Sequence, residues 1–326
     1  MQKEEVTILL PFHEKNQYLN DAIESCLNST NCTINILLID TRNREIARQN
    51  PLKKYENCRI ILAPGKKYID ALAIGIENAE TDYISIMNSD DLIAPDRIFK
   101  QLKKLDKTNS DLCITDVKKF SKNSDKAIPP LLGKFNHENY FVELLLFGSY
   151  GADATWFFTR KWAMRNEIFK CNLDSSDWAT ALRIFPETKI CKVNESLYFY
   201  RMHRKQITRH KKLESNEIIS ALVIYNQKIG LPPLHVMSIS GLAGFIRPKF
   251  RNYFDQISET NLEIWFDEVL SRYRFSAEEK ISLKNLFSRR LLLLSFSNIH
   301  YAKYFDSKTF YSIFSDILKS RGKFRW

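Results

Sequence analysis

The first 120 residues alternate between short apolar runs rich in β-branched residues and longer segments whose apolar positions repeat at helical spacing. The strand-like runs cover residues 6–10, 34–39, 59–62, 83–87 and 112–117. The helix-like segments cover residues 19–27, 68–79 and 95–105. Strands that alternate with helices indicate a mostly parallel sheet covered by helices on both faces, so the expected fold class is α/β.

Polar residues follow three of these runs directly. Phe12-His13-Glu14 ends the first run, Asp40-Thr41-Arg42 ends the second, and residues 88–91 end the fourth. Ligands of such sheets bind beyond the carboxyl ends of the strands. The pattern therefore points to a ligand site at this edge, although polar residues also end strands for purely structural reasons.

Composition limits the class of protein. The chain has 326 residues, of which 44% are hydrophobic and 27% charged, which fits a globular protein with a full core and excludes a disordered one. No apolar run approaches the roughly 20 residues of a membrane-spanning helix. The residues after Met1 lack a cationic start and an apolar core, so we expect no signal peptide.

Cysteine usage bears on the redox state of the chain. Six cysteines are scattered without a CxxC pair: Cys26, Cys32, Cys58, Cys113, Cys171 and Cys191. In a chain of this length without a secretion signal, buried reduced thiols are favoured over disulfides.

The second half of the chain changes character. Residues 121–140 are expected to form a loop, and residues 201–212 are strongly basic. From about residue 214 helical patterns dominate, and Ser276 to Glu279 has the pattern of a capping box that opens a helix. We therefore expect a domain boundary near residue 212.

The net charge of +11 suggests a polyanionic partner, with simple solubility as the alternative. Residues 241–326 carry 15 Lys or Arg against 9 Asp or Glu, together with 18 aromatic residues. Mixtures of bulky apolar and cationic side chains, as in residues 244–251 and 320–326, suit the surface of an anionic membrane. A helical subdomain with a solvated basic face is the alternative.

Asp90 and Asp91 follow a hydrophobic strand as an adjacent pair of carboxylates. Such a pair suits a divalent cation that also binds substrate phosphates. The alternative is a helix cap, because Asp is favoured in the turn before Pro95.

Taken in order, these pieces resemble the family 2 inverting glycosyltransferases of the GT-A fold over residues 6 to about 209. The matching segments are residues 6–13, 22–27, 36–40, 65–79, 83–97, 151–160, 173–183 and 198–203. The resemblance implies a GT-A domain, a Rossmann-like, mostly parallel sheet with flanking helices, over residues 1–212. Within it, residues 1–120 would bind the nucleotide sugar and residues 121–212 would form the acceptor side. A helical region, residues 213–326, would follow.

The resemblance also implies a site for the donor and for Mn²⁺ or Mg²⁺. Metal ligands would come from Asp90, Asp91 and His203, with a loop histidine near a basic surface as the alternative for His203. The implied donor-binding residues are Pro11, Phe12, His13, Glu14, Asp40, Gly65, Asp70, Asn88, Ser89, Asp90 and Arg201.

Asp177 matches the position of the family's general base, which takes the proton of the acceptor hydroxyl. The family usually has an acidic pair there, and here Ser176 replaces the first acid. Asp177 as a helix cap is the structural alternative, and Asp174 is the second candidate for the base.

Three positions depart from the family pattern. Asn88 replaces the first aspartate of the DxD motif, which leaves the charge to Asp90 and Asp91. The loop after Asp40 lacks the usual second aspartate and serine, and Pro64 precedes Gly65 where an asparagine is usual.

The function implied is inverting, metal-assisted transfer of a sugar from a nucleotide sugar, by default UDP-linked, to a hydroxyl of a glycan or lipid-linked acceptor in cell-surface polysaccharide synthesis. The location would be cytoplasmic or peripheral on the inner membrane face, and the aromatic-rich tail also suits a dimer interface. A catalytically weak or inactive sugar-binding scaffold is the alternative. No nucleic-acid-binding motif is present, and acidic strand ends would repel phosphate unless a metal intervened, so nucleic acid is not an expected partner.

Overall fold

The structure is a computed structural model of the 326-residue chain. It describes residues 3–13, 17–42, 55–121, 124–127, 153–170, 177–184, 187–203, 215–231, 259–273, 275–281, 283–284 and 287. The chain divides into two compact units: residues 1–144 with 148–230, and residues 145–147 with 231–326. The expected boundary near residue 212 falls within 204–214, outside the described residues.

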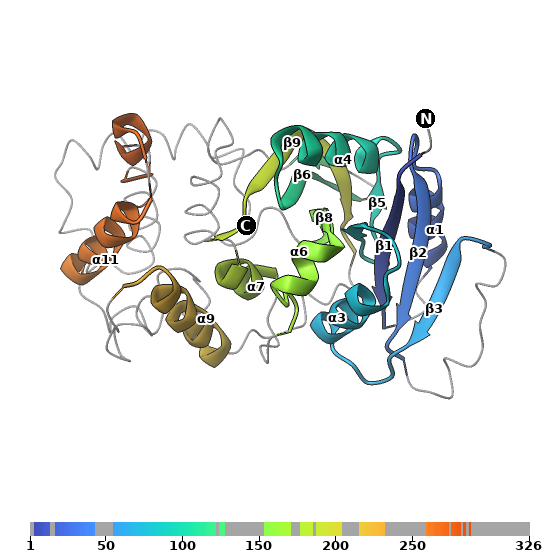
Figure 1. The fold of residues 1–326 in the computed structure, drawn as a ribbon, viewed down its shortest axis with the longest axis horizontal. Coiled ribbons are helices and arrows are strands. Elements are labelled where there is room, and N and C mark those ends of the chain that lie inside the picture. Colours follow the sequence, from blue (N-terminus) through green and yellow to red (C-terminus); the bar gives the residue numbers. More distant parts are fainter. Residues whose placement is uncertain are drawn as a thin grey trace. The chain divides into compact units, whose positions relative to one another are not determined.

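Unit 1 contains one mixed sheet with helices packed on it (Figure 1). Its strands are β1 (Glu5–Phe12), β2 (Thr33–Asp40), β3 (Cys58–Leu62), β4 (Tyr83–Ile86), β5 (Leu92–Ile93), β6 (Leu112–Ser121), β7 (Ser124–Ala127), β8 (Phe157–Thr159) and β9 (Ile190–Arg201). Its helices are α1 (Leu19–Leu27), α3 (Tyr68–Asn78), α4 (Arg97–Thr108), the 3₁₀ turn η1 (Asp153–Thr155), α6 (Arg160–Arg165), α7 (Asp177–Ile184) and α9 (Ser215–Lys228).

The strand order is β3-β2-β1-β4-β8-β6-β9-β5, with β7 added to β6. Strands β3, β2, β1 and β4 are mutually parallel, while β8 runs antiparallel to both β4 and β6. The prediction of a mostly parallel sheet with flanking helices is thus confirmed. The strand order reverses at β1, because β2 and β4 lie on opposite sides of it, and ligands bind at such a reversal.

Strands β1 and β2 are mostly apolar because both faces of the sheet are covered. Ile8 and Leu10 belong to the core cluster that includes α1 and α4, whereas Leu9 approaches Gly75 of α3 on the other face. Alternate side chains of one strand therefore enter two different layers of the core.

Strands β7 and β1 differ from the sequence-based expectation. The segment expected to be a loop contains β7, which forms a hairpin with β6 through the Ser121–Ser124 pair. Strand β1 also runs through Pro11 to Phe12, past the expected end. Proline is tolerated there because β4 pairs only with Val6 to Leu9, so no ladder bond to β4 is lost at Pro11.

The described part of unit 2 contains α11 (Glu259–Ser271) and the segment from Phe275. The predicted capping box is confirmed: the backbone N–H of Glu279 donates to Ser276 Oγ at 3.2 Å, and Ser276 N–H donates to Glu279 Oε2 at 2.8 Å. The basic aromatic segments 244–251 and 320–326 lie outside the described residues.

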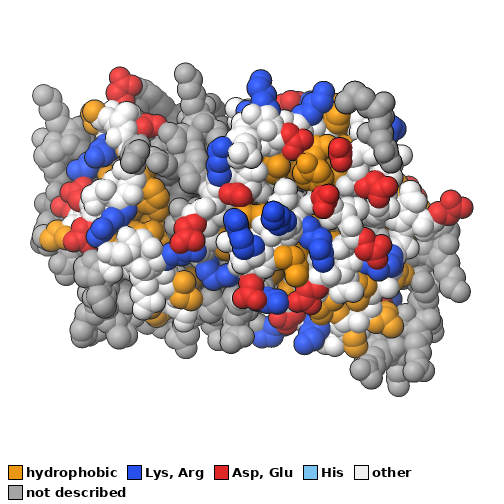
Figure 2. Space-filling view, in the orientation of Figure 1, with side chains coloured by type: hydrophobic (Ala, Val, Ile, Leu, Met, Phe, Trp, Pro, Cys, Tyr) orange, Lys and Arg blue, Asp and Glu red, His pale blue; other side chains and the backbone are white. Residues whose placement is uncertain are grey.

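None of the described helices is both long and apolar enough to cross a membrane. On the face shown in Figure 2, Lys and Arg side chains are interspersed with Asp and Glu side chains over the described residues. The excess positive charge therefore does not gather into a single patch on that face.

Candidate functional site

The polar residues at the strand ends are brought to one edge of the sheet. Because β1, β2 and β4 are parallel, their carboxyl ends point the same way, and Phe12 lies opposite Asp40 in the β1–β2 register. Residues 88–91 follow β4 on the other side of β1. The predicted common edge is confirmed, with Glu14 outside the described residues.

Asp91 lies at the bottom of this edge and is fully buried. Its Oδ2 accepts hydrogen bonds from the Tyr198 hydroxyl at 2.6 Å and from Asn88 Nδ2 at 3.2 Å. Its Oδ1 accepts from the backbone N–H of Arg201 at 2.7 Å. Burial, followed by the charge of Asp90, raises the pKa of Asp91 to about 7, against the effect of these three donors.

Asp90 is the carboxylate that stays accessible. Its Oδ2 lies 2.8 Å from His203 Nε2, and both side chains remain partly exposed. Arg201 Nε donates to the backbone carbonyl of Asp90 at 2.7 Å, so the end of β9 fixes the backbone beneath this carboxylate.

Arg201 is held on several sides. Its guanidinium lies between the rings of Tyr18, at 4.3 Å, and Phe120, at 4.8 Å, and its Nη2 contacts Asp21 Oδ2 at 3.3 Å. The Tyr18 ring also lies 5.1 Å from the ring of His203. Tyr18, just before α1, thus contacts both Arg201 at the end of β9 and His203 two residues later.

Asn88, which stands at the position of the first aspartate of the DxD motif, makes a contact that an aspartate could not make. Its Oδ1 accepts from the Tyr68 hydroxyl at 3.1 Å while its Nδ2 donates to Asp91. An aspartate could not donate to Asp91 and would place a further negative charge against a buried carboxyl group. The amide therefore links α3 to Asp91 without repulsion. Ser89 lies between these residues and is partly buried.

The end of β2 contains a buried ion pair. Arg42 donates from Nε and from its backbone N–H to Asp40 Oδ1, at 2.9 and 3.0 Å, and from Nη2 to Oδ2 at 2.7 Å. The guanidinium lies 5.1 Å from the centre of the Phe12 ring. Next to it, His13 is exposed, and its Nδ1 lies 3.2 Å from Thr41 Oγ1.

The remaining predicted donor-binding residues surround this edge. Pro11 is buried within β1, and Asp70 lies in the first turn of α3. Gly65 has a φ of 74°, a left-handed conformation that favours glycine, and its N–H donates to the carbonyl of Thr41 at 3.1 Å.

Asp177 is the first residue of α7, and the structure describes its backbone but not its side chain. Asp174 lies outside the described residues. Helix α7 is anchored by Arg183, whose Nη2 donates to the carbonyl of Glu167 at 2.9 Å. Helix α7 is thus tied to the residues that follow α6, while the roles of Asp177 and Asp174 stay predictions.

A buried arginine, Arg97, contacts the tyrosine that donates to Asp91. Arg97 is fully buried, and it donates to Gln101 Oε1 at 2.9 Å and to the carbonyl of Ala154 at 2.8 Å. Its guanidinium also lies 5.1 Å from the ring centre of Tyr198, and burial lowers its pKa to about 10. Helix α4 thereby contacts both the partner of Asp91 and η1.

Tyr18, Tyr68, Asp21, Arg97 and Tyr198 were not predicted as site residues, although Arg97 and Tyr198 lie in segments that resemble the family motifs. Each acts through a partner distant in sequence; the Tyr198 hydroxyl, for example, reaches Asp91 across 107 positions. The hydroxyl of an aromatic residue inside an apolar strand is a usable signal, because a buried phenol needs a hydrogen-bond partner.

The residues of this edge were tested for their fit to a divalent metal. Asp90 and His203 offer a carboxylate oxygen and an imidazole nitrogen at one point, which suits Mn²⁺. The geometry favours Asp90 over Asp91, whose oxygens face three protein donors. Among the described residues no group of three His, Cys, Asp or Glu is placed to hold a metal. Further ligands would have to be phosphate oxygens or water.

A comparison with protein families finds one family model that matches this chain. Residues 7–172, about half of the chain, match the model of glycosyl transferase family 2. The chain belongs to glycosyl transferase family 2. The sequence resemblance to this family is confirmed.

Several glycosyltransferases are similar to this chain in sequence. An uncharacterised glycosyltransferase of Haemophilus influenzae is 34% identical over 101 residues, which span 30% of this chain and 40% of the relative. The O-antigen biosynthesis glycosyltransferase WbnJ of Escherichia coli is 24% identical over 209 residues, 61% of this chain and 80% of the relative. The chain thus spans less than half of the first relative and most of the second.

Solved structures confirm the GT-A-like fold of this glycosyltransferase. The crystal structure of residues 1–349 of S. aureus TarS in complex with UDP-GlcNAc matches with a TM-score of 0.56 at 12% identity, over 88% of this chain and 81% of that one. The complex of the same protein with UDP matches with a TM-score of 0.53 at 12% identity, over 88% and 80% of the two chains.

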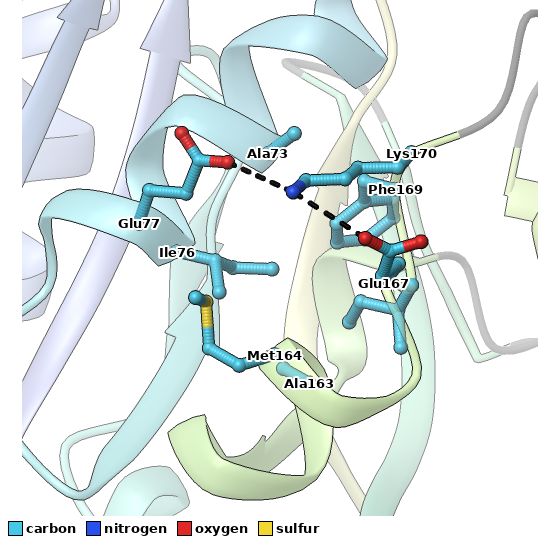
Figure 3. Close-up of a pocket in the computed structure, with 9 residues that line it drawn as sticks. Ala73, Ile76, Glu77, Ala163, Met164, Glu167, Phe169 and Lys170 are labelled. Atoms are coloured by element: carbon cyan, nitrogen blue, oxygen red, sulfur yellow. Dashed lines mark ion pairs between the residues drawn. The ribbon is translucent and has the colours of Figure 1, made fainter.

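The glycosyltransferase also has a pocket between α3 and α6, lined mainly by apolar side chains (Figure 3). Lys170 pairs with Glu77 at 3.3 Å and with Glu167 at 3.5 Å beside it. None of the predicted site residues lines this pocket, so it does not belong to the strand-end site.

Proposed function

We propose that this family 2 glycosyltransferase transfers a sugar with inversion from a UDP-sugar to a hydroxyl of a glycan or lipid-linked acceptor in the synthesis of a cell-surface polysaccharide. The observation that carries the proposal is the strand-end group of Asp90, Asp91, Arg201 and His203. The name of the E. coli relative supports a polysaccharide product, and the bound ligands of TarS support a uridine nucleotide.

Asp90 and His203 are the residues we propose to hold Mn²⁺ or Mg²⁺. When bound there, the ion would neutralise negative charge on the diphosphate of the donor. Asp91 would have a positioning role. It accepts a hydrogen bond from the backbone N–H of Arg201 and so fixes the end of β9, two residues before His203. Arg201, already bonded to the backbone of Asp90, would keep that carboxylate turned towards the donor.

Asp177 is the proposed general base. The acceptor oxygen forms a bond to the anomeric carbon while the bond from that carbon to the β-phosphate oxygen breaks. The electron pair leaves with the nucleoside diphosphate, and the hydroxyl proton passes to the Asp177 carboxylate. Proton transfer of this kind contributes about 10²- to 10⁴-fold to the rate.

The first test uses thermal stability and a panel of nucleotide sugars. A UDP-sugar together with Mn²⁺ should raise the melting temperature, since a ligand at 100 times its Kd adds about 2.7 kcal/mol. EDTA and the Asp90→Ala substitution should each remove the shift. If no nucleotide sugar changes the melting temperature with the metal present, the proposed donor site is wrong.

The second test separates chemistry from donor binding. Asp177→Asn should keep the UDP-dependent thermal shift but reduce the release of UDP from the donor by at least about 100-fold. Asp267→Asn is a matched control, because this carboxylate of α11 is exposed and pairs with Lys284 at 2.8 Å. Release of UDP by Asp177→Asn at the wild-type rate would exclude Asp177 as the base.

The alternative, a catalytically inactive sugar-binding scaffold, is favoured by the neutral Asn88 and by the closed Asp40–Arg42 pair. A thermal shift without UDP release under any acceptor condition would support it. We further propose that the basic, aromatic C-terminal region binds anionic membrane or forms a dimer. Co-sedimentation with phosphatidylglycerol vesicles, lost with neutral vesicles or at high salt, would separate the first from the second.

A further inference from the structure

The Asp40–Arg42 pair is the feature of the donor edge that the proposed chemistry leaves unused. Its side chains are only 2% and 9% exposed, and its charged atoms approach to 2.7 Å. An ionised carboxylate offers about four acceptor positions, and here three hydrogen bonds from a single residue occupy three of them. Asp40 therefore presents almost no free acceptor to any ligand.

The location of the pair places it beside the nucleotide. Asp40 is opposite Phe12 in the β1–β2 register, and β4, which leads to Asp90, lies on the other side of β1. A nucleoside diphosphate whose phosphates lie at Asp90 extends over neighbouring strand ends, because its ribose and base continue well beyond the diphosphate. The end of β2 is the neighbouring strand end on the side of β1 away from β4.

The chemistry of a free carboxylate there would be selective. Uracil has an imino N–H that can donate to a carboxylate, whereas cytosine has only an acceptor nitrogen at that position. A carboxylate would therefore bind uracil and repel the lone pair of cytosine. With its oxygens held by Arg42, Asp40 makes neither distinction.

We propose that Arg42 is a specificity-determining residue that makes the base subsite tolerant, so that the protein binds UDP and CDP with similar affinity. This inference rests on the proposed nucleotide-sugar function. It assigns recognition mainly to the diphosphate, and it makes the identity of the base a property of residue 42 rather than of Asp40.

The experiment measures the Kd of UDP and of CDP in the presence of Mn²⁺ by calorimetry, with the full chain and with Arg42→Ser. The wild-type protein should bind both nucleotides within about threefold of each other. Arg42→Ser frees the carboxylate, and the ratio should rise to about tenfold or more in favour of UDP, the size of effect expected for a hydrogen bond to a charged group. Arg59→Ser, an exposed arginine on the adjacent β3, should leave the ratio unchanged.

The outcomes distinguish the two proposals. Failure of the wild-type protein to bind either nucleotide contradicts the proposed function itself. A wild-type preference for UDP above about tenfold contradicts the tolerant subsite alone, and this measurement needs no variant that folds. A lower melting temperature for Arg42→Ser with an unchanged ratio would show that the pair is only structural, which also overturns the inference.

Discussion

Asp91 shows how one buried carboxyl group can hold the residues around it in place. Two of its three donors, Tyr198 and Arg201, lie in β9, and the third, Asn88, follows β4. The carboxyl group therefore connects the end of β4 to β9. Leaving a buried group of this kind without its partners costs about 1–3 kcal/mol per missing hydrogen bond. Stability and site geometry are therefore set by the same contacts.

Tyr198→Phe tests this link at the level of one atom. The substitution removes the hydroxyl that donates to Asp91 at 2.6 Å and keeps the buried ring. We expect the free energy of unfolding in urea to fall by about 1–3 kcal/mol. Tyr83→Phe is the control, because its hydroxyl contacts the exposed Asp106 and its loss should cost less than about 0.5 kcal/mol. Equal effects of the two changes would contradict the importance of the buried bond.

Buried polar side chains on α4 act in a similar way for the backbone. Gln101 Nε2 donates to the carbonyls of Thr155 and Cys113, at 2.8 and 2.9 Å, beside the bonds of Arg97. Both residues donate to main-chain oxygens that would otherwise lack a hydrogen-bond donor. This explains why two polar residues lie in the apolar stripe of α4.

At the scale of elements, the approach of α3 to the sheet depends on the absence of one side chain. A Cβ on Gly75 would lie 2.8 Å from Ile39 Cδ1 and 3.0 Å from Leu9 Cδ2, which is closer than a methyl group permits. Glycine here lets the helix pack directly on β1 and β2, although it lowers helix propensity.

Gly75→Ala should therefore destabilise the protein. Overpacking costs about 1–3 kcal/mol, while the gain in helix propensity returns only about 1 kcal/mol. Chemical denaturation should show a net loss. Adding Ile39→Val, which removes the closest methyl group, should recover part of that loss in the double variant. A stabilised Gly75→Ala protein would show that the helix can shift freely.

At the scale of the molecule, the cysteines report how completely the core of unit 1 is closed. Cys26, Cys32, Cys113 and Cys191 are buried, Cys58 is partly exposed, and all five described thiols are free. Burial raises the pKa of Cys26 to about 12 and that of Cys58 to about 11. Burial blocks the access of a thiol reagent, and the raised pKa values of Cys26 and Cys58 lower their thiolate fractions, so both effects slow the reaction.

Titration with a chromogenic disulfide reagent near about pH 8 should therefore label at most two of the six thiols in the native protein, and all six after denaturation. The raised pKa values give the sign of the pH effect. A group whose folded pKa lies above its unfolded value loses stabilising free energy as the pH rises through that range, here from 9.0 towards about 11 and 12. Rapid native labelling of four thiols would contradict the closed core.

The sequence by itself determined most of the strands and helices of the first 120 residues, the shared edge of Asp40 and Asp90, the capping box at Ser276 and the family. These follow from periodicity, turn chemistry and short motifs, which are local properties of the chain. The short strands β5 and β7 were missed because they are defined by pairing with other strands rather than by a local pattern. Strand β5, for example, is two residues long and pairs with Tyr198 and Phe199 of β9.

Only the tertiary structure decided what the site residues do. Asp90 and Asp91 are neighbours in sequence, yet one meets His203 at the surface while the other is buried under Tyr198. Asp40 has the residue type of a nucleotide ligand, but Arg42 occupies its oxygens. For Asp90 and Asp91 the physical reason is that the hydrogen-bond partners, which set the charge and availability of a carboxyl group, come from residues about 110 positions away. Arg42 is close to Asp40 in sequence, but only the folded chain shows that its guanidinium meets the carboxylate.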